Sequence, residues 1–165
     1  MTTHKGPPVD ATALIPDHLL QGESEYETRM LRAYAQEARG YLESFPWCTG
    51  IRQLLYGVGV GGVIAVFLGE LSIKALDREW LWIVAGDLPT AYFAAELADT
   101  PCLALRHYCA GVEAWAAAVR TGALDAQAMA LRAEASLEIA VELSAKVLTV
   151  RRIVLPVLCP CVSSD

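Results

Sequence analysis

GVGVGGVIAVFL (residues 57–68) and EWLWIVA (residues 79–85) decide the fold of this 165-residue chain. Both runs are rich in β-branched and aromatic residues, which favour strands. From residue 63 to residue 73 the odd positions stay apolar, whereas Glu70, Ser72 and Lys74 on the other parity are polar, which is the period of a strand. We predict strands at 51–60, 62–73 and 79–86, with Gly61-Gly62 as the turn of a hairpin.

The predicted strand 79–86 is apolar on both faces. Trp80, Trp82 and Val84 share one face, and Leu81, Ile83 and Ala85 share the other. Such a strand lies inside a sheet that is covered on both sides. The tryptophan face is either covered by the C-terminal tail or packed against a second copy of the chain, and we expect it to be covered.

Two other structures must be weighed for the glycine-rich segment. Gly57, Gly59 and Gly62 match the G-x-G-x-x-G pattern of dinucleotide-binding folds, but that motif needs a helix starting at the third glycine, and a strand-like segment follows here. Residues 53–69 contain no charge, and a membrane span needs roughly 20 apolar residues. A buried hairpin explains the segment better than either alternative.

Helix signals flank these strands on both sides. Ser24 and Glu27 form a capping box, Asp87 and Pro89 suit the start of a second helix, Thr100-Pro101 open a third, and Asp125 caps the last. Residues 1–22 are an irregular lead-in, and the apolar tail 151–165 is broken by two prolines, so we expect no helix there. The sequence predicts one α+β domain over residues 1–165, with a small antiparallel sheet of about three strands and about four helices: 25–43, 90–97, 101–121 and 125–149.

Composition limits the function. The net charge of −6 argues against nucleic-acid binding, which needs clustered Lys and Arg, and suits a basic partner. The N-terminal residues contain prolines and an aspartate where a secretory signal would be apolar, so we expect a cytoplasmic protein. The five cysteines agree, because the count is odd and Cys102 and Cys109 share a helical face, which suggests reduced thiols.

One motif carries a family resemblance. Trp82-x-x-x-Gly86-Asp87-Leu88-Pro89-Thr90-x-Tyr92, with the helix at Thr100-Pro101 and its Trp115, resembles an uncharacterised family of small bacterial cytoplasmic proteins. In that family a Trp-rich strand likewise ends in G-D-L-P-T-x-Y and helices follow. The resemblance covers roughly residues 50–122. It implies an α+β domain without a membrane span and brings no reaction with it.

Candidate catalytic residues have structural explanations beside them. Asp87, Tyr92 and His107 could line a pocket near the glycine hairpin, although a turn-capping aspartate also explains Asp87. No Ser-His-Asp or Cys-His arrangement is visible. Cys159-Pro160-Cys161 lacks the second ligand pair of a zinc site, and we expect no metal and no cofactor.

The acidic ladder Glu134, Glu138 and Glu142 is the best candidate for binding. Like charges four residues apart repel on a helix, and Lys146 relieves only the last of the three. An ordinary solvated face explains the ladder, and so does a landing surface for a basic protein. The leading hypothesis is a non-enzymatic interaction protein of the immunity or antitoxin type with a basic toxin as its partner. The alternative is a small-molecule binder or enzyme with a pocket around Asp87. Neither nucleic acid nor a membrane is an expected partner.

Overall fold

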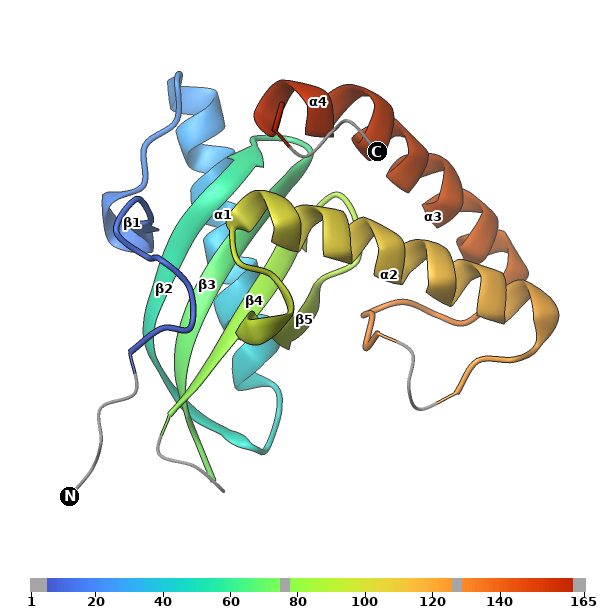
Figure 1. Cartoon of the computed structure of the whole chain (residues 1–165), viewed down its shortest axis with the longest axis horizontal. Coiled ribbons are helices and arrows are strands. Elements are labelled where there is room, and N and C mark those ends of the chain that lie inside the picture. Colours follow the sequence, from blue (N-terminus) through green and yellow to red (C-terminus); the bar gives the residue numbers. More distant parts are fainter. Residues whose placement is uncertain (1–5, 75–77, 126–128, 162–165) are drawn as a thin grey trace.

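The computed structural model describes residues 6–74, 78–125 and 129–161, and its centre is a five-stranded antiparallel sheet (Figure 1). Each strand pairs with its neighbours in the sequence, in the order β1-β2-β3-β4-β5. The predicted α+β class with an antiparallel sheet is confirmed, but three strands is too few, because β1 and β5 add one strand at each edge. The strands are β1 (Ile15–Pro16), β2 (Cys48–Val60), β3 (Ile64–Ile73), β4 (Glu79–Gly86) and β5 (Ala91–Ala94).

The glycine-rich segment is the β2–β3 hairpin. The Val63 amide donates to the Val60 carbonyl at 3.0 Å, and Gly62 takes a φ of +91°, which glycine adopts at little cost. At Gly59 an added Cβ would lie 2.7 Å from the Ile64 carbonyl oxygen, so the two strands need this glycine. A strand follows Gly62, and the segment therefore lacks the helix N-terminus that holds a pyrophosphate in dinucleotide-binding folds.

Helices cover both faces of the sheet. In Figure 1, α1 (Glu25–Glu43) lies behind the sheet and α2 (Pro101–Thr121) in front of it. Phe67 and Ile83 pack towards α1, whereas Trp82 packs towards α2 and is fully buried, and its indole N–H donates to the carbonyls of Ala95 and Ala98. The predicted alternation of β4 is confirmed. Trp80 and Trp82 are both buried, so they offer no open surface to a second copy.

Two predicted helices are confirmed and one is wrong. The Ser24 hydroxyl accepts from the Glu27 amide at the start of α1, and Thr100 caps α2 in the same way. The segment 90–97 forms β5 and a 3-10 turn at Ala95–Leu97 instead of a helix. The reason is cross-strand packing, since pairing with β4 places Phe93 opposite Trp82.

The last predicted helix, 125–149, is also wrong in its first part. Helix α3 (Leu137–Thr149) begins at Leu137 and is capped by Ser136, whose hydroxyl accepts from the Ile139 amide. Before it, Leu131 bridges to Ala91 of β5, and this pairing overrides helix propensity. Residues 126–128 of the predicted helix lie outside the described residues.

The C-terminal tail continues as a helix, which corrects the expectation of an irregular segment. A π-helical turn (Val150–Val154) leads directly into α4 (Leu155–Leu158). Pro156 lies in the first turn of α4, directly after the π turn, so the helical path continues past a residue that usually ends a helix. Residues 1–5 of the lead-in and 162–165 of the tail lie outside the described residues.

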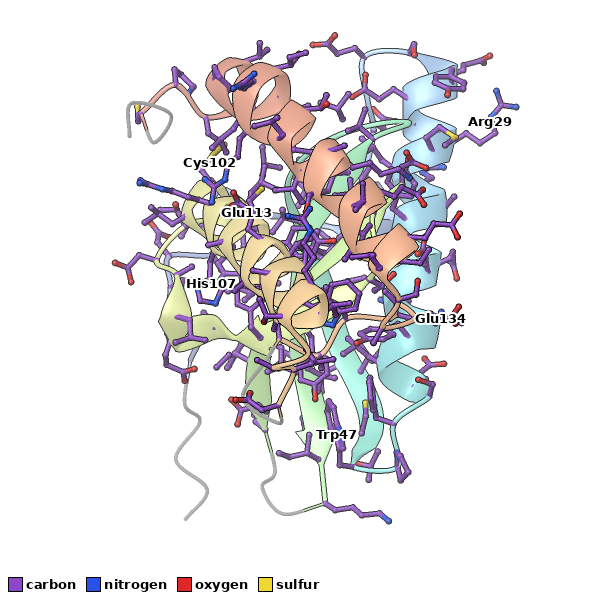
Figure 2. All side chains as sticks on the ribbon, turned by 90° about the vertical axis from the view of Figure 1, so that its right-hand side faces the viewer. Arg29, Trp47, Cys102, His107, Glu113 and Glu134 are labelled. Carbon is purple, nitrogen blue, oxygen red and sulfur yellow. A yellow bond between two sulfur atoms is a disulfide. The ribbon has the colours of Figure 1, made fainter. Side chains whose placement is uncertain are left out.

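Helix α2 and the C-terminal helices form an antiparallel pair joined at three levels (Figure 2). Arg120 donates to the Ser144 hydroxyl at 2.7 Å, Arg151 pairs with Glu113 at 2.6 Å, and Cys102 forms a disulfide with Cys159. The expectation of a reduced Cys102 is therefore wrong, while Cys109 is a buried free thiol as predicted. The disulfide removes the expected reduced thiols as an argument for a cytoplasmic location, which stays a prediction. The division of the chain into a single domain also stays a prediction. No helix in the described part of the chain has the length and apolar character to cross a bilayer.

Candidate functional site

The turn between β4 and β5 contains the Gly86-Asp87-Leu88-Pro89-Thr90 sequence and forms the centre of the candidate site. Gly86 has a φ of +139°, and an added Cβ would lie 2.5 Å from the Val63 carbonyl oxygen. The Asp87 amide donates to that same carbonyl at 2.8 Å. The turn is thus held against the β2–β3 hairpin, and any side chain at position 86 would separate them.

Side chains from both helical layers fix the rest of the turn. The buried Thr90 hydroxyl donates to Glu37 Oε1 of α1 at 2.7 Å, and Tyr108 of α2 donates to the Pro89 carbonyl at 2.6 Å. The Arg132 amide donates to the Thr90 carbonyl at 3.1 Å. These bonds bring α1, α2 and the segment before α3 to one point at the edge of the sheet.

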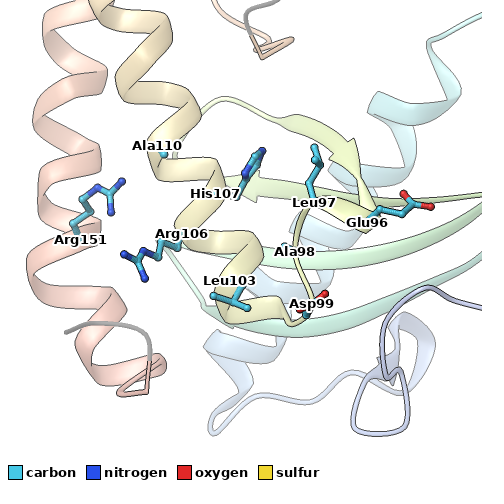
Figure 3. A pocket seen from close by; sticks show the side chains of 9 residues that line it. All are labelled: Glu96, Leu97, Ala98, Asp99, Leu103, Arg106, His107, Ala110 and Arg151. Atoms are coloured by element: carbon cyan, nitrogen blue, oxygen red, sulfur yellow. The ribbon is translucent and has the colours of Figure 1, made fainter. Parts of the chain in front are cut away.

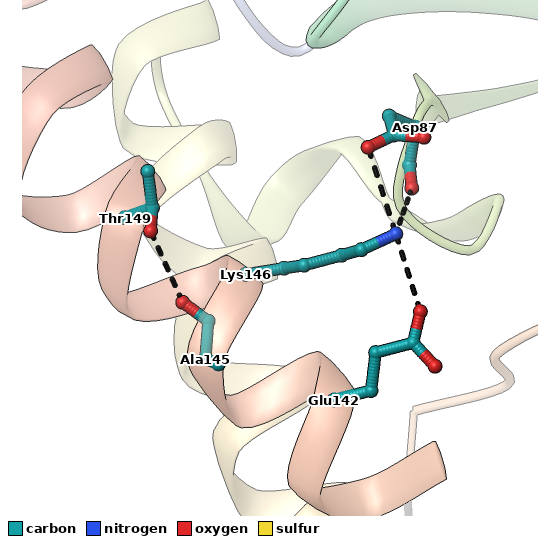
Figure 4. A network of polar contacts seen from close by, with 5 residues as sticks. All are labelled: Asp87, Glu142, Ala145, Lys146 and Thr149. Atoms are coloured by element: carbon teal, nitrogen blue, oxygen red, sulfur yellow. Dashed lines mark hydrogen bonds and ion pairs between the residues drawn. The ribbon is translucent and has the colours of Figure 1, made fainter.

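A cavity of about 360 Å³ opens beside this turn. Its charged lining consists of four carboxylates and two cations. Lys146 reaches across it, with its Nζ 3.2 Å from the Asp87 carbonyl oxygen and 3.5 Å from a carboxylate oxygen of both Asp87 and Glu142 (Figure 4). The side chains of Asp87 and Glu142 remain 67% and 53% exposed, so each ion pair contributes little stability. The charged lining residues are Glu37, Asp87, Arg132, Glu134, Glu142 and Lys146.

The three glutamates of the predicted ladder are all exposed, but they do not share one helix. Glu138 and Glu142 lie on α3, whereas Glu134 precedes its first residue, near α1 in Figure 2. The prediction that the three glutamates lie along one side of a single helix is therefore wrong. Glu134 and Glu142 nevertheless line the same cavity, because the segment before α3 folds back onto the Pro89-Thr90 turn. Partner binding by these residues stays a prediction.

Asp87, Tyr92 and His107 are not brought together in one cavity of the described residues. Asp87 lines the 360 Å³ cavity, while Tyr92 and His107 line another of about 540 Å³. Tyr92 belongs to an aromatic cluster with Tyr41, Phe45 and Trp47. Only the hairpin part of the predicted pocket is near Asp87, through the contact with Val63.

His107 also lines an open cavity of about 840 Å³, between the start of α2 and the π turn (Figure 3). Its ring contacts Phe93, with 4.6 Å between the ring centroids. The cavity carries both charge signs, from Glu96 and Asp99 on one side and Arg151 on the other. Within the described residues no group of three His, Cys, Asp or Glu side chains is placed to hold a metal ion.

Among the described residues, none of the groups with a shifted pKa lines the 360 Å³ cavity at the Asp87 turn, and the largest shifts come from burial. Burial raises the pKa of the Cys109 thiol to about 11, so this thiol is protonated at neutral pH and is a poor nucleophile. Burial likewise raises the pKa of Tyr41 and of Tyr56 to about 12.

Sequence reasoning missed four of the cavity residues: Glu37, Thr90, Arg132 and Lys146. Thr90 is part of the GDLPTAY motif that carries the family resemblance. Its polar side chain beside buried residues is the signal that would have pointed to it. Lys146 was visible as the residue four positions after Glu142. Glu37 and Arg132 carry no local signal, because only the fold brings them to the turn.

Comparison of the chain with protein-family models, with curated proteins and with solved structures finds no match.

Proposed function

We propose that this chain is a non-enzymatic interaction protein of a bacterial cytoplasm, of the immunity or antitoxin type, which neutralises a basic protein partner by binding it. The observation that carries the proposal is the convergence of Glu37, Asp87, Glu134 and Glu142 on one open cavity. These carboxylates come from three separate parts of the chain. The bacterial origin and the compartment rest on the resemblance of the GDLPTAY segment.

The cavity suits the cationic end of a lysine or arginine side chain. Lys146 already shows the arrangement, because its ammonium group contacts a backbone carbonyl and two carboxylates there. An arginine from a partner offers five N–H donors in a planar fork, which matches carboxylates better than an ammonium does. Glu138, exposed on the next turn of α3, extends the negative surface beyond the cavity. Such a surface mainly raises the association rate and selects basic partners.

A pull-down with charge-neutralising variants of the chain tests the proposal. The tagged chain is used to isolate partners from the native cell, and retention is compared between wild type and the variant Glu134→Gln/Glu138→Gln. The control Glu23→Gln/Glu96→Gln changes the net charge equally at exposed sites elsewhere. We expect a basic protein whose retention falls with the first variant and with salt, and persists with the control. Equal retention by both variants would refute the proposal.

A small-molecule binder is the second candidate, and the size of the cavity favours it. A volume of about 360 Å³ lies at the lower end of the range of ligand pockets, roughly 300–1,000 Å³. Arg132 and Lys146 stand among the carboxylates, so a zwitterion would find both charges matched. Titration of the labelled protein with free arginine, followed by amide chemical shifts, tests it. Saturable shifts confined to residues 87–90 and 132–146 support a ligand site, and their absence contradicts it.

A further inference from the structure

The outer side of the C-terminal helices carries an exposed apolar ridge. Every fourth residue from 137 to 157 lies on the exposed surface, and none of these six residues is charged. Leu137, Val141, Ile153 and Val157 are 63%, 54%, 64% and 78% exposed. The outer ridge consists of Leu137, Val141, Ala145, Thr149, Ile153 and Val157.

The ridge lies on a helix that is also apolar on its inner side. Ala140, Leu143 and Val147 of α3 are buried in the core shared with α2 and the sheet. A surface helix normally carries a polar outer face, whereas here an exposed apolar row runs beside the exposed charges of Glu138, Glu142 and Arg152. Polarity within the ridge is low, because the Thr149 hydroxyl donates to the Ala145 carbonyl at 3.2 Å (Figure 4). A contiguous apolar row of this kind is typical of an interaction surface.

Charges along the helix indicate which occupant fits. Between residues 134 and 158, all acidic residues come first and all basic residues follow. A second copy in antiparallel orientation places the acidic half of each helix along the basic half of the other, whereas a parallel copy places like charges together. A basic protein that covered the whole ridge, beyond the acidic end proposed above as its binding surface, would be repelled by the second half, and an anionic membrane would be repelled by the first half. The acidic residues are Glu134, Glu138 and Glu142, and the basic ones are Lys146, Arg151 and Arg152. Lys146 and Arg151 pair with Glu142 and Glu113 of the same chain, so the exposed Glu138 and Arg152 are the charges that would face a second copy.

The helix is also held rigidly, which lowers the cost of association. The disulfide from Cys102, the ion pair between Glu113 and Arg151 and the hydrogen bond from Arg120 to Ser144 all link it to α2 on the inner side. At the middle of the ridge the side chains of Ala145 and Thr149 are small, so two helices can approach closely there. From these observations we infer that the outer ridge is a homodimer interface in which two copies pack antiparallel about a two-fold axis.

Sedimentation equilibrium of the full chain at loading concentrations from about 5 to about 500 µM tests the dimer. A single helix face makes a small interface, so we expect a dissociation constant on the order of 10–100 µM. The variant Val141→Gln/Ile153→Gln should weaken the dimer at least about tenfold without changing the net charge. The control Leu19→Gln/Leu97→Gln removes two apolar side chains of similar exposure elsewhere and should leave it unchanged. A wild-type chain that stays monomeric, or a control that weakens the dimer equally, overturns the inference.

A charge exchange tests the antiparallel orientation. Glu138→Arg and Arg152→Glu should each weaken the dimer, because each places a like charge in the opposing half. In the double variant an arginine at position 138 again faces the opposite charge, now a glutamate at position 152 of the other copy. The double variant should therefore regain most of the dimer affinity. Circular dichroism of all variants checks that α3 is intact. A double variant that dimerises no better than the single variants overturns the antiparallel arrangement.

Discussion

Loss of the Cys102–Cys159 disulfide is the perturbation whose cost follows most directly from the structure. The bond closes a loop of 57 residues and joins the first turn of α2 to the residue after α4. The loop-entropy model gives a stabilisation of roughly 4 kcal/mol for a closed loop of this length. We therefore expect Cys102→Ala to lower the free energy of unfolding by about 3–5 kcal/mol, to which the lost packing of the half-buried sulfur adds little.

Guanidinium chloride unfolding of the wild type and Cys102→Ala, each with and without a reducing agent, measures this cost. Reductant should destabilise the wild type by nearly the same amount and leave the variant unchanged. The control Cys161→Ser removes an exposed thiol that is not bridged and should keep the wild-type midpoint.

Thiol counting provides the refuting result. The chain has five cysteines, and three of those described are free, so the unfolded, unreduced protein should react with three equivalents of a thiol reagent. Five reactive thiols in freshly purified protein would show that the bridge does not form. Equal midpoints with and without reductant would show that the loop-entropy reasoning fails here.

Three further predictions concern Gly86 in the turn, the two tyrosines with raised pKa values, and the buried Cys109 thiol. Gly86→Ala should lower the free energy of unfolding by about 2–4 kcal/mol, because its positive φ and the nearby Val63 carbonyl oppose a Cβ. The control Gly40→Ala, with open space around it in α1, should raise the free energy of unfolding by about 0.5–1 kcal/mol. The midpoints of denaturant unfolding measure both changes. Tyr41 and Tyr56 have folded pKa values of about 12, above the ordinary 10.0, so the stability that they contribute is full below pH 10 and is lost as the pH rises towards 12. Unfolding at several pH values should show this loss, smaller in Tyr56→Phe. Alkylation at pH 8 should label the exposed Cys161 rapidly and Cys109 only on unfolding, because the buried Cys109 thiol has a pKa of about 11. Mass spectrometry of peptides, taken at two denaturant concentrations, measures the labelling of each cysteine. A Cys109 label that appears before the protein unfolds would contradict this prediction.

Local signals in the sequence located the elements whose structure is decided by neighbouring residues. The Ser24 and Thr100 caps start α1 and α2 where we predicted, and the parity of residues 63–73 separates the two faces of β3. In each case the determining contacts join residues a few positions apart, or follow from the period of a strand.

Prediction failed where distant segments meet. The segment 90–97 has an acceptable helix start, but its pairing with β4 outweighs that preference. Asp125 is a suitable residue type for a helix cap. The segment after residues 126–128, however, bridges to Ala91, and α3 starts only at Leu137, after its cap Ser136. Proline at position 156 predicts the end of a helix, but the structure places it in the first turn of α4, directly after a π turn.

The candidate site follows the same division. From the sequence, Asp87, Glu134, Glu138 and Glu142 could be named as candidates, since carboxylates outside an apolar pattern are visible in a list of residues. Their grouping, with Glu37 and Lys146 around one cavity, could not be named, because it depends on the return of the chain to the Pro89-Thr90 turn.

By itself the sequence determined the sheet's hairpin, its two-sided burial and the two capped helices, because short-range sterics and hydrophobic periodicity specify them. Only the tertiary structure decided the edge strands, the late start of α3, the Cys102–Cys159 pairing and the cavity at the Asp87 turn. The physical reason is that each of these depends on contacts between residues far apart in the chain, whose energies no local pattern records.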